Sequence, residues 1–331
     1  MRYPKISIVT PSYNQGDYIE KTLVSVAKQA YPNYEHIVMD GGSTDRTVEV
    51  LETWSERLTY WESQPDRGQS HAINKGLARS TGEILTWLNS DDQLTESALF
   101  RVAEAFEEDP EPALVYGNCL LLSETGSEKL SLPTQDTRTL LGGMSFAQPA
   151  SFFSRWAYEQ FGPLNETLDF AMDYDFFMPV AQQAERVRYL PHTLAKYLYH
   201  AESKSVQHNA AFAREYALIL QKLLRSAGDA AAGWVEKLKA ADLWESETMA
   251  IGTYAFSEPI PDEQLREAVL RNMVSQVKYY YAATELRKAR HRLAWIKDEA
   301  PAFFRNEPQL AATYQRTRWL TPWLLRWLRR F

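Results

Sequence analysis

The chain has 331 residues, of which 45% are hydrophobic and 24% charged, a composition typical of a globular protein with one large domain or two. Its net charge of −7 argues against a general nucleic-acid-binding protein. The single cysteine, Cys119, excludes an internal disulfide and a cysteine-based metal cluster, and its apolar neighbours predict a buried thiol.

The sequence shows no signal-peptide pattern and enters a predicted strand at Lys5. No apolar run approaches the roughly 20 residues that a membrane-spanning helix requires. We therefore expect a cytoplasmic protein.

Strand and helix patterns alternate four times in the first 92 residues. The strands are predicted at residues 5–10, 35–39, 58–61 and 84–88. The first helix is predicted to open at Asp17, with Glu20 completing a capping box, and the third at Ser70. Such alternation predicts an α/β fold with right-handed crossovers, a mostly parallel sheet and flanking helices. The polar loops that follow the strands should gather at one edge of this sheet, where α/β proteins bind nucleotides.

Asp40 ends the second strand and begins the sequence Asp40-Gly41-Gly42. Its carboxylate could accept hydrogen bonds from a nucleobase or ribose, or it could stabilise the Gly-Gly turn as an Asx-turn residue. The spacing is not the G-x-G-x-x-G fingerprint of dinucleotide-binding proteins, and the sequence has no Walker A loop. These absences argue against a dehydrogenase or a P-loop ATPase.

The strand predicted at residues 84–88 runs directly into Asn89-Ser90-Asp91-Asp92. Two adjacent carboxylates at the end of a buried strand repel each other, so a divalent cation that carries a phosphate-bearing ligand is a natural counter-charge. The alternative is that Asp92 or Thr95 opens the next helix as its N-cap. The sequence alone leaves both interpretations open.

Two strands joined as a hairpin are predicted at residues 114–117 and 119–123. Further on, Asp173 and Asp175 stand among aromatic residues at the start of a predicted helix, where their side chains should diverge by about 200°. Either could be a helix N-cap. Because Met172 and Tyr174 flank Asp173, we expect partial desolvation to raise its pKa, which suits a general base.

The remainder is predicted to be helical at residues 210–226, 230–251 and 262–298. We interpret this region as an extension that packs on the catalytic domain or on a second subunit of a homo-oligomer. Residues 316–331 combine tryptophans at helical spacing with arginines and contain no acidic residue. This pattern predicts either a helix at a membrane surface or one docked on the protein's own core.

Several motifs in this order resemble the inverting glycosyltransferases of family 2, which have the GT-A (Rossmann-like) fold. The matching segments are KISIVTPSYNQGDYIEKTLVSVAKQAYPNYEHIVMDGGSTDRT, PDRGQSHAINKG, STGEILTWLNSDD, GMSFAQPASFF and AMDYDFF. The resemblance covers residues 4–206, which implies a catalytic domain at residues 1–206 and a helical extension at 207–331. It is closest to the branch that builds bacterial O-antigen and capsule polysaccharides.

The resemblance also implies site residues. Thr10, Pro11, Tyr13 and Asp40 would contact the base and ribose of the donor, and Arg67 and Asn74 would line the donor pocket. There Arg67 could either meet a phosphate or be a solvated loop arginine. The family's Asp-x-Asp motif falls on Asn89-Ser90-Asp91, with asparagine in place of the first aspartate. Asp91 would then be the main ligand of Mn²⁺ or Mg²⁺, with Asp92 close by and His200 reaching the metal or the diphosphate. The base would be Asp173, although Met172 replaces the usual acidic residue before it. We assign acceptor binding to Gln148 and Asp175.

The function expected from these residues is metal-assisted transfer of a sugar from a nucleotide-sugar, expected to be a UDP-sugar, to a hydroxyl of a glycan or lipid-linked saccharide. Such an acceptor suits a peripheral position on the inner face of the cell membrane. One alternative is a sugar nucleotidyltransferase, but the loop PSYNQGD lacks the basic residues of that class. The other is a catalytically inactive nucleotide-sugar-binding or scaffold protein.

Overall fold

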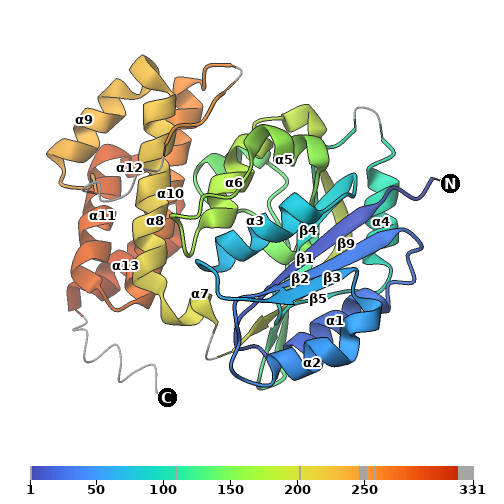
Figure 1. Cartoon of the computed structure of the whole chain (residues 1–331). Coiled ribbons are helices and arrows are strands. Elements are labelled where there is room, and N and C mark those ends of the chain that lie inside the picture. The colour runs from blue at the N-terminus through green and yellow to red at the C-terminus, as the bar shows by residue number, and fades with distance from the viewer. Residues whose placement is uncertain (1, 109–110, 201–202, 246–251, 257, 320–331) are drawn as a thin grey trace. The chain divides into compact units, whose positions relative to one another are not determined.

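The computed structural model describes residues 2–108, 111–200, 203–245, 252–256 and 258–319 (Figure 1). The chain divides into two compact units. One consists of Met1–Thr137 and Ser145–His200, and the other of Arg138–Met144 and Ala201–Phe331. Within the described residues, no helix is both long and apolar enough to cross a membrane.

The first unit is built on a nine-stranded sheet with the order β3-β2-β1-β4-β8-β6-β9-β5, in which β7 pairs with β6. Strands β1 to β4 run parallel to one another where they pair, and β9 is parallel to β6, whereas β5, β7 and β8 each pair antiparallel with their neighbours. The strands are β1 (Ile6–Ser12), β2 (Tyr34–Asp40), β3 (Tyr60–Ser63), β4 (Ile84–Trp87), β5 (Gln93–Leu94), β6 (Leu114–Ser123), β7 (Glu128–Ser131), β8 (Ser151–Ser154) and β9 (Val187–Tyr199). The predicted α/β class and mostly parallel sheet are confirmed.

Helices cover both faces of the sheet, as Figure 1 shows. On one face Val38 of β2 packs with Leu23 and Leu51, which come from α1 and α2. On the other face α3 approaches so closely that a side chain at Gly76 would collide with Val9 and Met39. The helices of this unit are α1 (Ile19–Ala27), α2 (Thr47–Trp54), α3 (Gln69–Arg79), α4 (Ala98–Ala105), α5 (Arg155–Phe161) and α6 (Met172–Ala181).

The two predicted helix caps are wrong. Helix α1 begins at Ile19, and Asp17 forms an ion pair with Arg46 instead of capping it. Helix α3 begins at Gln69 after Gly68, whose φ of +112° favours glycine, so Ser70 lies inside the helix. Both helices therefore open on loop geometry that a local capping pattern does not detect.

The predicted hairpin within residues 114–123 is also wrong. This segment is one strand, β6, and the hairpin lies further on, between β6 and β7. The pairing of β6 with β9 shifts in register at Gly117 and Asn118, where a side chain on Gly117 would collide with the His192 carbonyl oxygen. The glycine thus permits a bulge within a continuous strand.

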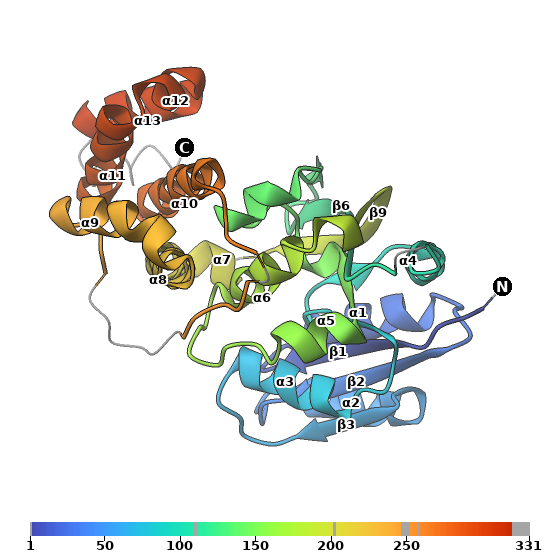
Figure 2. The same ribbon diagram turned by 90° about the horizontal axis from the view of Figure 1, so that it is seen from above.

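The second unit is helical. Its helices are α7 (Lys204–Gln207), α8 (Asn209–Ser226), α9 (Ala232–Ala240), α10 (Asp262–Ala282), α11 (Leu286–Glu299), α12 (Pro301–Asn306) and α13 (Pro308–Trp319). Helix α8 packs along α10, as both views show (Figure 2). The single helix predicted at residues 262–298 is two helices, because Thr284 adopts a left-handed φ of +63° and ends α10. Most of the predicted basic helix at 316–331 lies outside the described residues.

Candidate functional site

The loops after β1, β2, β3 and β4 lie at one edge of the sheet because these strands run parallel. Strand β9 is parallel to β6 and brings His200, the residue that follows it, to the same edge. The candidate site is built from these loops.

The loops after β1 and β2 brace each other through Asn14. Its backbone N–H donates to Ser43 Oγ at 2.7 Å, and its side-chain Oδ1 accepts from the Thr44 N–H at 2.9 Å. Asn14 has a φ of +52°, which asparagine tolerates better than most residues. The Gly16 N–H adds a third bond, to Asp45 Oδ2 at 2.8 Å. The two loops therefore form one preorganised unit.

Asp40 lies at this edge, but it is buried and its carboxylate binds the protein. Oδ2 accepts hydrogen bonds from the Gly42 N–H (3.1 Å), the Ser43 N–H (2.8 Å) and Ser63 Oγ (2.6 Å), and Oδ1 accepts one from Ser43 Oγ (2.5 Å). Three of these bonds lie within the loop after β2, and the fourth joins that loop to Ser63 at the end of β3. The geometry matches the turn-stabilising role that the sequence left open.

Thr10 is fully buried, and its Oγ1 lies 2.9 Å from Nε2 of His36. Burial lowers the pKa of His36 to about 3, so the imidazole is neutral at physiological pH. The Thr10 side chain is thus bonded to the neighbouring strand inside the protein. Pro11 is buried as well, whereas the ring of Tyr13 is 61% exposed beside them.

Asp91 and His200 come together at the carboxyl edge, with Asp91 Oδ2 2.9 Å from His200 Nε2. The Asp91 side chain is 22% exposed and that of His200 is buried. The ring of Tyr18, the residue before α1, lies over the imidazole with its centroid 4.4 Å away. Three segments far apart in the sequence thus meet around one partly exposed carboxylate.

Asp92 is turned inward. Its Oδ1 accepts from the Leu198 N–H at 3.3 Å and its Oδ2 from Asn89 Nδ2 at 3.2 Å. Burial, and then the charge of Asp91, raise the pKa of Asp92 well above its ordinary value. The alternative that Asp92 or Thr95 caps the next helix is not realised, because α4 follows Ser97 without a side-chain cap.

The backbone of this loop is held by Thr22 of α1, whose Oγ1 donates to the carbonyl oxygens of Ser90 (2.9 Å) and Asp92 (2.6 Å). Ser90 itself is buried. Asn89 donates to Asp92 and accepts from Gln69 Nε2 at 2.8 Å. An amide at position 89 thus serves as a donor to a buried carboxylate, where an aspartate would add a third negative charge.

Among the described residues, no three histidine, cysteine, aspartate or glutamate side chains gather closely enough to bind a metal by themselves. Of the three predicted ligands, Asp91 and His200 meet, whereas both carboxylate oxygens of Asp92 have protein partners. A cation at this edge would therefore complete its coordination with ligand and water oxygens.

Arg67 and Asn74 are brought together by Glu166, which the sequence analysis did not single out. Glu166 Oε2 accepts from Arg67 Nη2 at 2.6 Å, and its Oε1 accepts from Asn74 Nδ2 at 3.1 Å. Asn74 is buried and also bonds the backbone of Leu164. Its amide is thus committed to the protein, whereas the Arg67 side chain remains 68% exposed.

The aromatic rings of Phe176 and Phe177 pack against Trp87, the last residue of β4, and so bring α6 close to the loop that carries Asp91. Asp173 lies in the first turn of α6, half-buried, and Asp175 is buried. Asp173 is therefore the more exposed of the two. Neither caps the helix, which follows Ala171 without a side-chain cap.

Gln148, predicted to bind the acceptor, is buried, and its Nε2 donates to the Trp87 carbonyl oxygen at 2.8 Å. Its amide group therefore fixes the short segment before β8 to the end of β4. The structure places Gln148 beside the site with this donor already in use.

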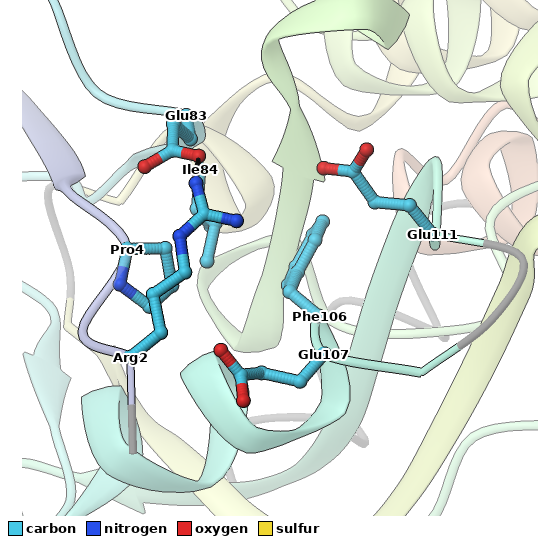
Figure 3. A pocket seen from close by; sticks show the side chains of 7 residues that line it. All are labelled: Arg2, Pro4, Glu83, Ile84, Phe106, Glu107 and Glu111. Atoms are coloured by element: carbon cyan, nitrogen blue, oxygen red, sulfur yellow. Dashed lines mark hydrogen bonds and ion pairs between the residues drawn. The ribbon is translucent and has the colours of Figure 1, made fainter.

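A polar cavity of about 470 Å³ lies before the amino ends of β1 and β4, at the opposite edge (Figure 3). Arg2 crosses it and pairs with Glu83. Glu107 and Glu111 complete a lining in which carboxylates outnumber cations. Its charge does not suit a nucleotide diphosphate, so we place the site at the carboxyl edge.

Comparison with known proteins identifies the family of the chain. The family described as Glycosyl transferase family 2 matches residues 7–131. A PGL/p-HBAD biosynthesis glycosyltransferase of Mycobacterium bovis (strain BCG / Pasteur 1173P2) is 30% identical over 181 residues, which are 53% of this chain and 69% of the relative. An uncharacterized glycosyltransferase of Mycobacterium tuberculosis is 29% identical over 187 residues, covering 56% of this chain and 71% of the relative.

Two solved structures share the fold. Residues 1–349 of S. aureus TarS, in complex with UDP, superpose with a TM-score of 0.59 at 18% identity, covering 95% of this chain and 90% of that one. The mannosyltransferase PcManGT from Pyrobaculum calidifontis, in complex with GDP-Man and Mn²⁺, gives a TM-score of 0.53 at 18% identity over 96% and 88%. The fold is GT-A-like, and with the matched family and relatives this shows that the chain belongs to the family 2 glycosyltransferases.

Proposed function

We propose that the protein is an inverting glycosyltransferase that moves a sugar from a UDP-sugar to a hydroxyl of a glycan or lipid-linked saccharide. The observation that carries this proposal is the meeting of Asp91 and His200 at the carboxyl edge, together with the packing of α6, which carries the half-buried Asp173, against Trp87 at the end of β4. The chemistry requires a group that holds a cation for the departing diphosphate and a base for the acceptor hydroxyl. Asp91 supplies the first of these functions and Asp173 the second.

A divalent metal, Mn²⁺ or Mg²⁺, fits the residues present. Asp91 offers a partly exposed carboxylate, and His200 holds it with an imidazole nitrogen, which is a common type of metal ligand. Asp92 supports the loop from inside, through Asn89 and the Leu198 N–H. When bound, the metal supplies positive charge to the diphosphate as the bond to the sugar breaks. The Mn²⁺ in the PcManGT complex supports this assignment.

Donor recognition in this proposal depends on the loops that Asp40 and Asn14 organise. Tyr13 presents an exposed ring that can stack on a base, and the backbone around Pro11 can contact it. The exposed guanidinium of Arg67 can approach the phosphates. The UDP and UDP-GlcNAc in TarS structures support a UDP-sugar, although PcManGT holds GDP-Man.

In the transfer step Asp173 takes the proton from the acceptor hydroxyl, and that oxygen attacks the anomeric carbon from the face opposite the diphosphate. The bond between the anomeric carbon and the diphosphate oxygen breaks as the new glycosidic bond forms, so the configuration at that carbon inverts. Because the displacement is direct, the protein needs no nucleophile of its own. The buried side chains of Asp175 and Gln148 support the acceptor side of the site.

We further propose that residues 1–206 act as the catalytic domain and residues 207–331 as a helical extension. The acceptor class matches the O-antigen and capsule branch that the motifs resemble, and it fits a cytoplasmic enzyme that works at the membrane surface. These assignments follow from the motifs and extend beyond the family membership itself.

The test compares the hydrolysis of UDP-sugars with the binding of UDP in an Asp173→Asn variant. We expect turnover to fall at least about 100-fold, the usual contribution of a general base, while the affinity for UDP stays within twofold. Glu159→Gln, an exposed carboxylate on α5, should retain both. Full turnover in Asp173→Asn would refute the base, and a wild-type protein that binds UDP without turning over any UDP-sugar would support a scaffold instead.

A further inference from the structure

The segment between α5 and α6 is tied to α3 by side chains on one face of that helix. Asn74 makes a two-point contact with Leu164, donating from Nδ2 to its carbonyl oxygen (2.9 Å) and accepting from its N–H (2.9 Å). Four residues earlier in α3, and therefore on the same face, Ser70 Oγ donates to the Leu168 carbonyl oxygen at 3.0 Å. The segment that leads to Asp173 is thus fixed at two points.

Glu166 extends this attachment to the loop after β3. One oxygen, Oε1, accepts from Asn74, and the other, Oε2, accepts from both Nη2 (2.6 Å) and Nε (3.2 Å) of Arg67. Burial alone would raise the pKa of Glu166, but hydrogen bonds from Asn74 and Arg67 outweigh it and lower the pKa. The carboxylate therefore stays ionised and holds both partners at once.

These contacts join two parts of the proposed site that are about 100 residues apart in the chain. Arg67 belongs to the loop from which we expect contact with the donor phosphates, and Glu166 lies seven residues before Asp173. Beside them, a side chain added at Gly68 would come within 3.8 Å of Asp169, so the loop and the segment are direct neighbours.

We propose that Glu166 is a positioning residue that sets the distance between the donor-side Arg67 and the segment that carries the base. It acts through Arg67 and Asn74 and does not itself touch the substrate. This inference rests on the proposed roles of Asp173 and Arg67. Its physical basis is that a carboxylate has two acceptor oxygens, so it can serve both partners, whereas an amide has one.

The first test is Glu166→Gln, which keeps the shape but loses one of the two attachments. We expect kcat/KM for the UDP-sugar to fall about tenfold, with both a higher KM and a lower kcat, while Glu166→Asp recovers part of the loss. The matched control is Glu108→Gln, which removes another arginine–glutamate ion pair, with Arg188 Nε at 2.7 Å, at the start of β9. Wild-type kinetic constants in Glu166→Gln would overturn the proposal.

A double variant separates positioning from general stability. If Glu166 acts on the donor side through Arg67, then Arg67→Gln combined with Glu166→Gln should raise the donor KM no further than Arg67→Gln alone. Multiplicative effects on KM would contradict this. A loss of activity in Glu166→Gln that only follows the loss of folded protein, as measured by melting, would also contradict it.

Amide hydrogen exchange keeps the inference testable even if no UDP-sugar is turned over. In the protein without ligand, Glu166→Gln should increase exchange at residues 164–173, and Glu108→Gln should leave that segment unchanged. If Glu166→Gln leaves the exchange of residues 164–173 at the wild-type rate, Glu166 does not position the segment. If the wild-type protein turns over no UDP-sugar but Glu166→Gln still increases exchange at residues 164–173, the proposed function is refuted and the positioning role of Glu166 is retained.

Discussion

Replacing Asp40 distinguishes a residue that organises the loops from one that binds the donor. Its carboxylate accepts four hydrogen bonds, three at Oδ2 and one at Oδ1. In Asp40→Asn the amide oxygen can occupy the Oδ2 position and keep three of them, and the Ser43 hydroxyl can reverse to accept from the amide. In Asp40→Ala all four are lost and two backbone N–H groups, of Gly42 and Ser43, lose their acceptor.

The expected loss of stability follows from that count. At about 1 kcal/mol for each bond, Asp40→Ala should lower the free energy of unfolding by about 4 kcal/mol, and Asp40→Asn by about 1 kcal/mol because its bonds are kept without the negative charge that strengthens them. Urea denaturation followed by tryptophan fluorescence measures both, and UDP titration of the folded variants measures donor affinity. If Asp40→Ala keeps wild-type stability but loses UDP binding, Asp40 is a donor ligand and our reading of its bonds is wrong.

Three further predictions concern packing, charge and the metal. Burial would raise the pKa of Glu35, but hydrogen bonds from Lys5, Ser7 and Thr81 lower it from 4.5 to about 2. This shift corresponds to about 3 kcal/mol of stability, which is fully present above pH 4.5 and is lost as the pH falls toward 2. Urea denaturation of wild type and Glu35→Gln should therefore differ at pH 7 and converge near pH 2, and a constant difference would contradict this. Gly76→Ala should destabilise the protein by about 1–3 kcal/mol because its Cβ would collide with Val9. The control Gly233→Ala, whose Cβ would enter open space in α9, should stabilise the protein by about 0.5–1 kcal/mol. Equal shifts in melting temperature would argue against the close contact at Gly76. Tyr18→Leu should weaken Mn²⁺ binding in the presence of UDP two- to tenfold, because it removes the ring that lies over His200, whereas Tyr18→Phe should not. Electron paramagnetic resonance of Mn²⁺ measures both affinities, and identical affinities in the two variants would exclude the stacking effect.

The sheet could be predicted from the sequence because its signals are local. Apolar β-branched runs such as Ile6–Thr10 and Ile84–Leu88 alternate with helical spacing, and this alternation determines a parallel sheet and the edge at which Asp40 and Asp91 lie. The fold class could therefore be predicted from patterns of residues that are close together in the sequence.

The partners of the site residues could not be predicted in this way. Asn74 and Arg67 meet Glu166 across more than 90 residues, and Thr22 binds the Asp92 carbonyl oxygen across 70. No local pattern encodes such pairs. For the same reason Thr10 was expected to contact the donor, whereas its hydroxyl bonds to the buried His36, 26 residues away on the neighbouring strand β2.

Cap and turn predictions failed where backbone geometry decides the outcome. Gly68 begins α3 with a positive φ and Thr284 ends α10 with one, and neither is marked by the capping residues that sequence patterns use. Positive φ at a threonine is unfavourable by itself, so the packing of the surrounding helices must determine it.

The most direct test of the central claim is calorimetric titration of UDP into the wild-type protein and an Asp91→Asn variant, each with and without Mn²⁺. We predict that Mn²⁺ tightens UDP binding to the wild type by at least about tenfold and has no effect on Asp91→Asn, because that variant loses the partly exposed carboxylate next to His200. Equal binding of UDP to both proteins, with or without Mn²⁺, would contradict the proposed donor site.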